Sequence, residues 1–260
     1  MSLLLDLPRA LFAVSLAALW LSEWVGVSFR KYRRNGAEHE REGFNLVASA
    51  TLTLLGLIIG FSFSMAISRY DQRKNLEEAE ANAIGTEYVR ADLLPAAEAA
   101  KVRVLLASYL GQRILFYKTR DEGELRQVDA ATAQLQGDLW SLVRAAALAQ
   151  PTPVIALAVS GMNDVLNSQG YTQAAWWNRI PTAAWGLMAA IAICSNLLIG
   201  YGVHGTGTKA LLFIVLPLVV SISFFLIADI DSPRRGIIRV RPQNLESLSQ
   251  SLQALPGGTK

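Results

Sequence analysis

The sequence predicts an all-helical integral membrane protein with four transmembrane helices and a helical cytoplasmic domain inserted between spans two and three. Of its 260 residues, 52% are hydrophobic and only 17% are charged, whereas roughly a quarter of the residues of a soluble domain are charged. No stretch alternates for long as a strand would. The apolar residues gather in four windows that are each long enough to cross about 30 Å of hydrocarbon: Ala10 to Phe29, Gly43 to Ser68, Pro181 to Val203 and Lys209 to Ile230.

The first window is expected to be a retained helix. A cleaved signal peptide is the alternative, but only Arg9 provides positive charge ahead of the window, and no small-x-small cleavage site precedes Glu23. The sole cysteine, Cys194, lies inside the third window, so neither an intrachain disulfide nor a cysteine metal cluster is available.

Four crossings place both termini and the long middle segment on one side of the membrane. Lys and Arg residues near the span ends are more numerous on that side, which predicts cytoplasmic termini in the cell inner membrane. The resulting division is a first transmembrane hairpin, a cytoplasmic helical domain, a second transmembrane hairpin and a basic C-terminal tail: 1–68, 69–180, 181–230 and 231–260.

The middle segment is predicted to be helical throughout. Residues 71–94 form a helix closed by Pro95, residues 96–118 carry apolar side chains at helical spacing, and two further helices fit Glu122 to Ala149 and Val154 to Ser168. Acids and bases of the first of these helices lie three and four residues apart. They predict a solvated or subunit-facing charged surface, with a cation-binding vestibule as the alternative: Glu77, Glu80, Glu87 and Asp92 with Arg73, Lys74 and Arg90.

A stripe of small and polar residues follows one face of the second span. At about 100° per residue, its members fall within roughly 60° of one another, with Phe63 at the border: Ser49, Thr53, Gly56, Gly60 and Ser64. Such a stripe favours either close packing of another helix with hydroxyl bonds across the contact, or the lining of a water-filled axis that Phe63 could constrict by dewetting. The residues alone leave both interpretations open.

Two segments carry a family resemblance. "GFSFSMAISRYDQRKNLEEAEANAIGTEYVRADLLP" (60–95) and "FFLIADIDSPRRGIIRVRPQNL" (224–245) resemble the bacterial bestrophin-like domain family, whose function is largely unassigned, and the order of spans agrees along nearly the whole chain. More distantly, the chain is similar to bestrophin channels. Those channels are pentameric and mostly anion-selective, with cytoplasmic termini and a pore-lining second helix.

The resemblance implies a homo-oligomer, with a pentamer favoured, that conducts inorganic ions through a pore lined by the stripe. The sequence differs from that of true bestrophins at two positions. No tryptophans follow Arg69, and no Phe-Gly follows Pro233. The run of acids that completes the calcium clasp of animal bestrophins is also missing. Neither calcium gating nor any metal or other cofactor is therefore expected.

Charged residues mark the ends of the spans. Asp229 and Asp231 could hold a cation, but two carboxylates do not supply the six or more oxygens that calcium takes. Salt bridges to Arg69, Arg73 or the nearby arginines are favoured instead, and Arg69 is expected to meet Asp229. A cluster at the cytoplasmic mouth is predicted from Arg69, Asp71, Arg73, Asp229, Asp231, Arg234 and Arg235. The tail "RRGIIRVR" could bind anionic lipid or concentrate anions, although positive-inside anchoring also explains it.

Glu23 lies inside the first span, about six residues before Arg30. An ionisable group at that depth is a functional hypothesis by default. Its side chain could instead snorkel to the interface or pair with arginines of the following loop.

The predicted function is therefore a bestrophin-like oligomeric ion channel that conducts passively, with anions somewhat favoured. The alternative is a non-conducting membrane scaffold or sensor that binds a partner through its cytoplasmic helices. An enzyme is not expected, because no nucleophile, base or metal cluster stands in a recognisable arrangement. Acids and bases are nearly balanced in 69–180, which excludes a nucleic-acid footprint.

Overall fold

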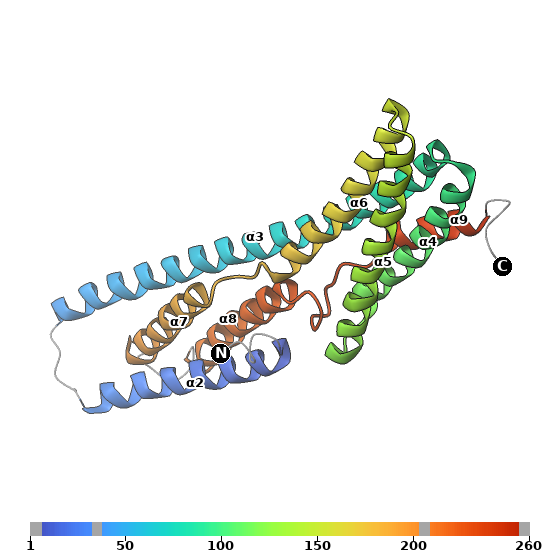
Figure 1. Ribbon diagram of the computed structural model, residues 1–260. Coiled ribbons are helices and arrows are strands. Elements are labelled where there is room, and N and C mark those ends of the chain that lie inside the picture. Colours follow the sequence, from blue (N-terminus) through green and yellow to red (C-terminus); the bar gives the residue numbers. More distant parts are fainter. Residues whose placement is uncertain (1–6, 33–37, 203–208, 255–260) are drawn as a thin grey trace. The chain divides into compact units, whose positions relative to one another are not determined.

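The structure is a computed structural model that describes residues 7–32, 38–202 and 209–254 (Figure 1). Side chains are described in 7–29, 43–202 and 213–254. Every element within these ranges is helical: α2 (Pro8–Tyr32), α3 (Glu38–Arg90), the 3-10 turn η1 (Ala91–Leu93), α4 (Ala96–Lys118), α5 (Glu122–Ala149), α6 (Pro153–Trp177), α7 (Thr182–Gly202), α8 (Lys209–Asp231) and α9 (Gln243–Ala254).

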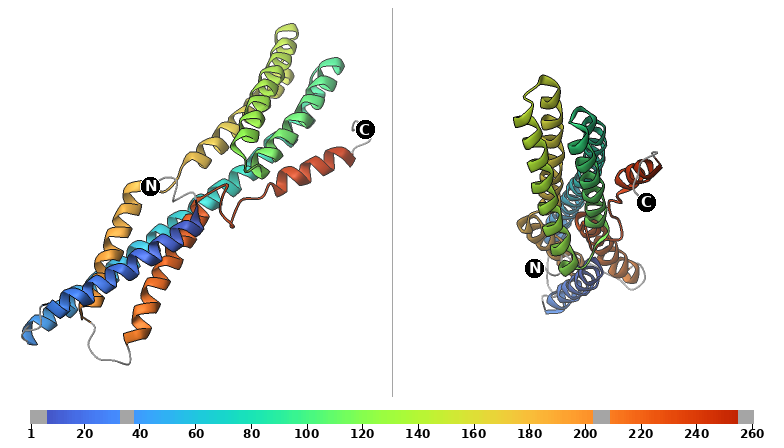
Figure 2. Two further views of the ribbon diagram at one scale, coloured as in Figure 1. Left: turned by 90° about the horizontal axis from the view of Figure 1, so that it is seen from below. Right: turned by 45° about the vertical axis from the view of Figure 1, so that its right-hand side comes forward.

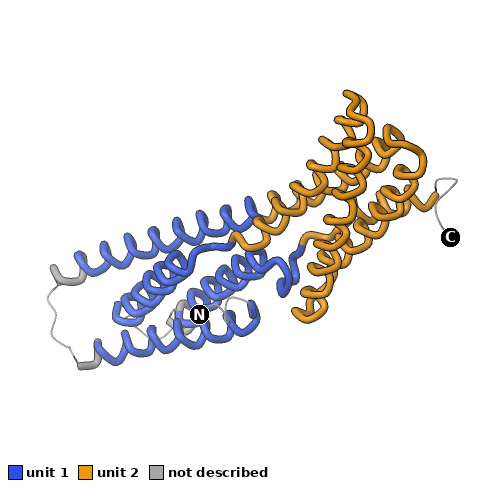
Figure 3. Tube along the Cα trace, viewed as in Figure 1, with its two compact units in different colours: residues 1–69, 179–239 blue, residues 70–178, 240–260 orange. Residues whose placement is uncertain are grey.

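Four of the described segments are long and apolar enough to cross a membrane, which confirms the predicted number of spans. The chain divides into two compact units (Figure 3). We call residues 1–69 and 179–239 the spanning unit, and residues 70–178 and 240–260 the helical unit.

The helix α3 runs through both units without interruption. The sequence analysis gives the second span and the helix over 71–94 separate bounds, whereas the structure joins them in a single helix of 53 residues. No proline and no glycine stand between Gly60 and Gly85 to interrupt it. At 1.5 Å per residue, α3 is about 80 Å long, so a large part of it extends beyond about 30 Å of hydrocarbon. Pro95 holds Leu94 extended, with φ −87° and ψ 160°, and ends the segment.

In the spanning unit, α2 and α7 run in one direction, and α3 and α8 run in the other (Figure 1). The helices α2 and α7 approach closely at two glycines. A Cβ atom on Gly26 would lie 2.2 Å from the Leu197 carbonyl oxygen, and one on Gly200 would lie 2.1 Å from the Glu23 carbonyl oxygen. Ser22 Oγ donates a hydrogen bond of 2.7 Å to the Ile193 carbonyl. This seam follows the small-residue and hydroxyl pattern of packed membrane helices.

The seam between α2 and α8 is built around Pro217, which lies inside α8. Proline has no N–H, so the carbonyl four residues earlier, that of Phe213, loses its helical partner. The Trp20 indole Nε1 donates to this carbonyl at 3.0 Å. A freed backbone group in a membrane span requires a replacement partner of this kind.

In the helical unit, α5 lies beside both α4 and α6 (Figures 1 and 2). Its bounds are those predicted from the sequence. The predicted end of the next helix at Ser168 is wrong, because α6 continues to Trp177. Gly170 costs the helix only about 1 kcal/mol, and the extra turns bury Thr172 and Trp176.

Candidate functional site

All six residues of the predicted pore-lining set are exposed in the single chain: Ser49, Thr53, Gly56, Gly60, Phe63 and Ser64. The same part of α3 buries Leu55, Ser62 and Ala66 instead. At about 100° per residue, these three lie about 130° around the helix from the middle of the stripe. The helix therefore packs within its own chain through one narrow face and leaves the stripe uncovered, together with most of its remaining surface.

The glycines of the stripe make no close contact within the chain. A Cβ atom on Gly56 or Gly60 would meet no atom within 4 Å. Thr53 Oγ1 donates to the Ser49 carbonyl at 2.9 Å, so this hydroxyl is satisfied by its own helix. Packing within the chain consequently does not explain why the residues of the stripe are small.

At one end of the spanning helices, Asp231 joins three segments. Its carboxylate lies 3.7 Å from Arg69 Nη1 and 3.5 Å from Arg179 Nε, and it accepts the backbone N–H of Ile180 at 3.1 and 3.2 Å. The end of α8 is thus tied to α3 and to the segment before α7. Sequence reasoning did not include Arg179, which lies far from Asp231 in the chain and carries no motif.

Asp229 has a different role from the one expected. Its Oδ1 accepts the N–H of Ile237 at 2.7 Å, and its Oδ2 accepts the N–H of Ile238 at 2.8 Å. Gly236 makes this return of the chain possible, because a Cβ atom there would lie 2.2 Å from the Asp229 carbonyl oxygen. The expected pair of Arg69 with Asp229 is therefore wrong, and Arg69 pairs with Asp231 instead. Both Asp229 oxygens are engaged by backbone, which leaves little for a cation.

The other residues of the predicted mouth cluster are distributed between the units. In the helical unit, Asp71 is exposed and Arg73 is 2% exposed. In the spanning unit, Arg235 is exposed and Arg234 is partly buried. Within the described residues, no group of three or more His, Cys, Asp or Glu side chains is arranged to hold a metal ion.

Of the four acids expected on a solvated or subunit-facing surface, Asp92 is exposed, but the three on α3 are enclosed within the chain. Glu77, Glu80 and Glu87 are all buried. Glu77 accepts the backbone N–H groups of Asn244 and Leu245 at 3.0 Å each, and Asn244 Nδ2 at 2.6 Å. These are orphan N–H groups at the start of α9, so Glu77 acts as a cap supplied by another helix.

Glu80 is the centre of a buried polar network. It forms an ion pair with Arg113, and it accepts hydrogen bonds from Tyr117 at 3.4 Å and Thr172 at 3.2 Å. The Arg113 guanidinium also lies 4.4 Å from the centre of the Phe116 ring. These contacts join α3, α4 and α6 and satisfy a charge that would otherwise be costly to bury.

Glu87 is fully buried, and neither of its carboxylate oxygens has a hydrogen-bond partner among the described residues. Burial raises its pKa to about 8, Arg90 opposes the rise, and Asp164 adds to it. The carboxyl is accommodated by Gly161 of α6, because a Cβ atom there would lie 2.0 Å from Glu87 Oε2. Glu87 lies 18 residues beyond Arg69, roughly 27 Å further along α3.

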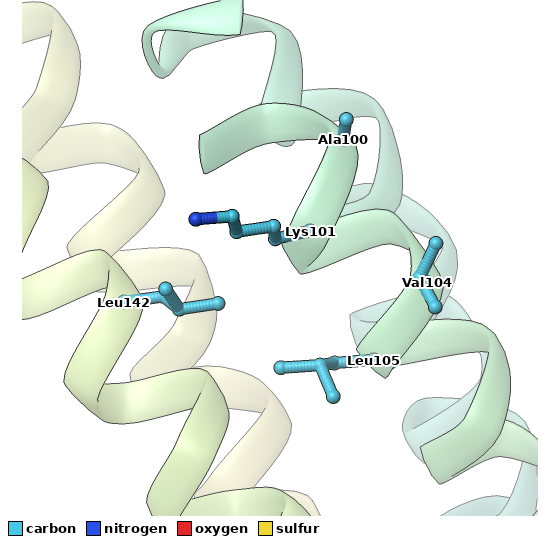
Figure 4. A pocket seen from close by; sticks show the side chains of 5 residues that line it. All are labelled: Ala100, Lys101, Val104, Leu105 and Leu142. Atoms are coloured by element: carbon cyan, nitrogen blue, oxygen red, sulfur yellow. The ribbon is translucent and has the colours of Figure 1, made fainter. Parts of the chain in front are cut away.

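A shallow pocket of about 420 Å³ lies between α4 and α5 (Figure 4). Lys101 and Leu105 point from α4 towards Leu142 of α5. Ligand sites combine an apolar lining with a few convergent polar groups. Lys101 is the single charged residue in this lining, which is otherwise made of Ala100, Val104, Leu105 and Leu142, so the pocket gives no basis for a ligand.

Together, these features define an all-helical membrane protein with four helices able to span a bilayer and a second spanning helix that continues far beyond it. The sequence matches the bestrophin-like domain over residues 10–245, and the chain belongs to the bestrophin-like domain family. This family and its fold are known as those of ion channels rather than enzymes, and bestrophin homologs are oligomeric. Among curated proteins, none matches this chain.

Solved structures show the same fold. A crystal structure of a bacterial bestrophin homolog from Klebsiella pneumoniae is similar with a TM-score of 0.68 and 15% identity, covering 95% of this chain and 99% of that one. A point mutant of that homolog gives a TM-score of 0.66 at 14% identity, covering 95% of this chain and 99% of that one. At such identities the likeness concerns the fold alone.

Proposed function

We propose that the protein is an oligomeric ion channel that conducts ions passively through a pore lined by the stripe on α3. Membership of the bestrophin-like family supports the proposal. The observation that carries it is the exposure of the stripe away from the face with which α3 packs in its own chain. A helix exposed in this way is available to face an axis shared by several copies.

The proposed path contains no ionisable residue between Gly43 and Ser68. Ions would contact hydroxyls, backbone and the apolar side chain of Phe63, which is 37% exposed and could form a constriction that dewets. The arginines of the tail after α8, including the exposed Arg235, raise the local anion concentration. For this reason we propose that anions are somewhat favoured.

The proposed assembly is a homo-pentamer in the cell inner membrane, with both termini and residues 69–180 in the cytoplasm. The pentamer follows from the resemblance to bestrophins. The orientation follows from the excess of Lys and Arg on the termini side. Native mass spectrometry of the purified protein tests the subunit number.

Conduction is tested with purified protein in a planar bilayer under a tenfold KCl gradient. The reversal potential identifies the permeant ion, because it approaches the equilibrium potential of chloride or of potassium. We expect Phe63→Ala to change the conductance. Phe61→Ala is the matched control, because Phe61 is exposed but lies about 160° around the helix from Phe63.

The scaffold or sensor alternative predicts a different result. Protein shown to be folded and oligomeric would then carry no current under any gradient. Replacing Gly60 by Leu separates the two functions further. A pore should assemble and change its conductance, whereas a scaffold that packs through this stripe should misassemble.

A further inference from the structure

Glu23 is a buried acid of the spanning unit that has no partner among the described side chains. Its side chain is 0% exposed, and neither carboxylate oxygen has a hydrogen-bond partner within the part of the chain whose side chains are described. The carboxyl is thus enclosed within its unit, while the side chains of the loop arginines with which it could pair lie outside the described ones.

The neighbouring helix α7 presents a second orphaned oxygen. Gly200 of α7 lies against the Glu23 backbone, as its 2.1 Å Cβ distance shows. One helical turn earlier, Asn196 is also 0% exposed. Its Nδ2 donates to the Ala192 carbonyl at 2.8 Å, but its Oδ1 has no partner among the described residues. An ionised Glu23 and the Asn196 amide oxygen are both acceptors, so neither can donate to the other. The adjacent Ser195 hydroxyl is buried and has no partner among the described residues, but no hydrogen bond joins it to either oxygen.

The helices packed against α2 supply no cation from their described side chains. In α7, the titratable residues are Cys194, which is exposed, and Tyr201, whose ring packs on Phe44. In α8, the Asp229 carboxylate accepts backbone N–H groups. The Asp231 carboxylate accepts a backbone N–H and also pairs with arginines.

The remaining basic residues of these helices do not place a described cation beside Glu23 either. On α2 itself, Arg9 is about 21 Å from Glu23 along the helix. The side chains of Arg30, Lys31 and Lys209 lie outside the described ones. A carboxyl group in apolar surroundings without a partner takes up a proton instead of remaining charged.

We propose that Glu23 is a proton-binding site inside the spanning unit, occupied at neutral pH, and that its O–H donates to Asn196 Oδ1. The neutral acid supplies a donor for Asn196 Oδ1 and removes the charge from the two Glu23 oxygens. The site lies between α2 and α7, apart from the stripe on α3, and its ligand is a proton. Release of the proton would leave a charge at the tightest helix crossing of the unit and would loosen the seam.

Infrared spectroscopy of the protein reconstituted in lipid tests this directly. At neutral pH, we expect the carbonyl stretch of a protonated carboxyl in the wild type, shifted by exchange into heavy water. Glu23→Gln should remove this band while preserving the shape of the side chain. Glu87→Gln is the matched control, because Glu87 contributes a protonated carboxyl of its own in the helical unit.

A second variant tests the partner and leaves the carboxyl in place. Asn196→Leu removes the acceptor, so we expect the Glu23 band to persist at the higher frequency of a carboxyl without a hydrogen bond. An unchanged frequency would overturn the role of Asn196. If Glu23→Gln fails to fold, Glu87→Gln decides the proton site, because the absence of any protonated-carboxyl band in that variant at neutral pH would overturn it.

The proposal is overturned if Glu23→Gln removes an ionised carboxylate band at neutral pH instead. Two further spectra would then identify what holds the charge. A change of the carboxylate band in Lys209→Gln would indicate the lysine, and a change in wild-type protein in buffer free of sodium and potassium would indicate a bound metal cation.

Discussion

Glycines in two regions of the spanning unit differ in what surrounds them. At the α2–α7 seam, Gly26 and Gly200 lie so close to the facing backbone that any side chain would overlap it. On α3, Gly56 and Gly60 face open space within the chain. A small residue in a membrane helix can therefore mark either a closed contact within one chain or a surface kept free for another purpose, and only the fold separates the two.

The largest expected effect comes from filling the closed site. We expect Gly200→Leu to abolish the folded state, because overpacking by single methylene groups already costs roughly 1–3 kcal/mol and this side chain would meet backbone. Gly60→Ala should instead raise the free energy of unfolding by about 0.5–1 kcal/mol, since glycine destabilises a helix interior. Unfolding of both variants in detergent, followed by circular dichroism, checks the two signs.

The second glycine of each region should give the same result as the first. We expect Gly26→Leu to abolish the folded state as Gly200→Leu does, and Gly56→Ala to raise the free energy of unfolding as Gly60→Ala does. Strong destabilisation by Gly60→Ala would contradict the comparison. It would show that the stripe is close-packed against another helix in the assembled protein, as the packing interpretation of the sequence holds.

The comparison also explains which features could be predicted from the sequence. Four spans and the bounds of α5 were predictable, because apolar length and helical periodicity are local properties. The buried acids were not. Glu77 lies three residues after Lys74, which suggests a solvated pair, yet its partners are the first N–H groups of α9, far along the chain.

The pairing of Asp231 was equally hidden. Asp229 and Asp231 have the same chemistry and similar neighbours in the sequence. Their roles differ because the chain after α8 turns back at Gly236 and brings Ile237 and Ile238 to Asp229, which leaves Asp231 to Arg69 and Arg179. Long-range geometry of this kind carries no local signal.

Gly161 in the helical unit is a third case, in which the space is filled by the carboxyl of Glu87. The pKa of Glu87 is about 8 when folded against 4.5 as the ordinary value. Between these values the folded chain holds a proton that the unfolded chain has released, so rising pH favours unfolding. We expect stability to fall by about 1.4 kcal/mol per pH unit in this window and to level off above it.

Chemical unfolding at a series of pH values, compared between wild type and Glu87→Gln, isolates this contribution. The difference between the two curves should slope only between the unfolded and folded pKa values. A difference that is constant with pH would mean that Glu87 is already ionised and paired in the assembled protein. Glu98→Gln, on α4, provides a control at an acid that is not buried.

A modest effect is expected at the α2–α8 seam, where α8 contains Pro217. Trp20→Phe should lower stability by about 1 kcal/mol, because it removes the donor to the Phe213 carbonyl. Pro217→Ala restores a helical N–H to that carbonyl, so Trp20→Phe should cost less in this background. A double-mutant cycle measures the difference as a coupling energy. Equal costs in both backgrounds would mean that Trp20 stabilises the seam through the area of its ring, and that the carbonyl freed by Pro217 is satisfied in another way.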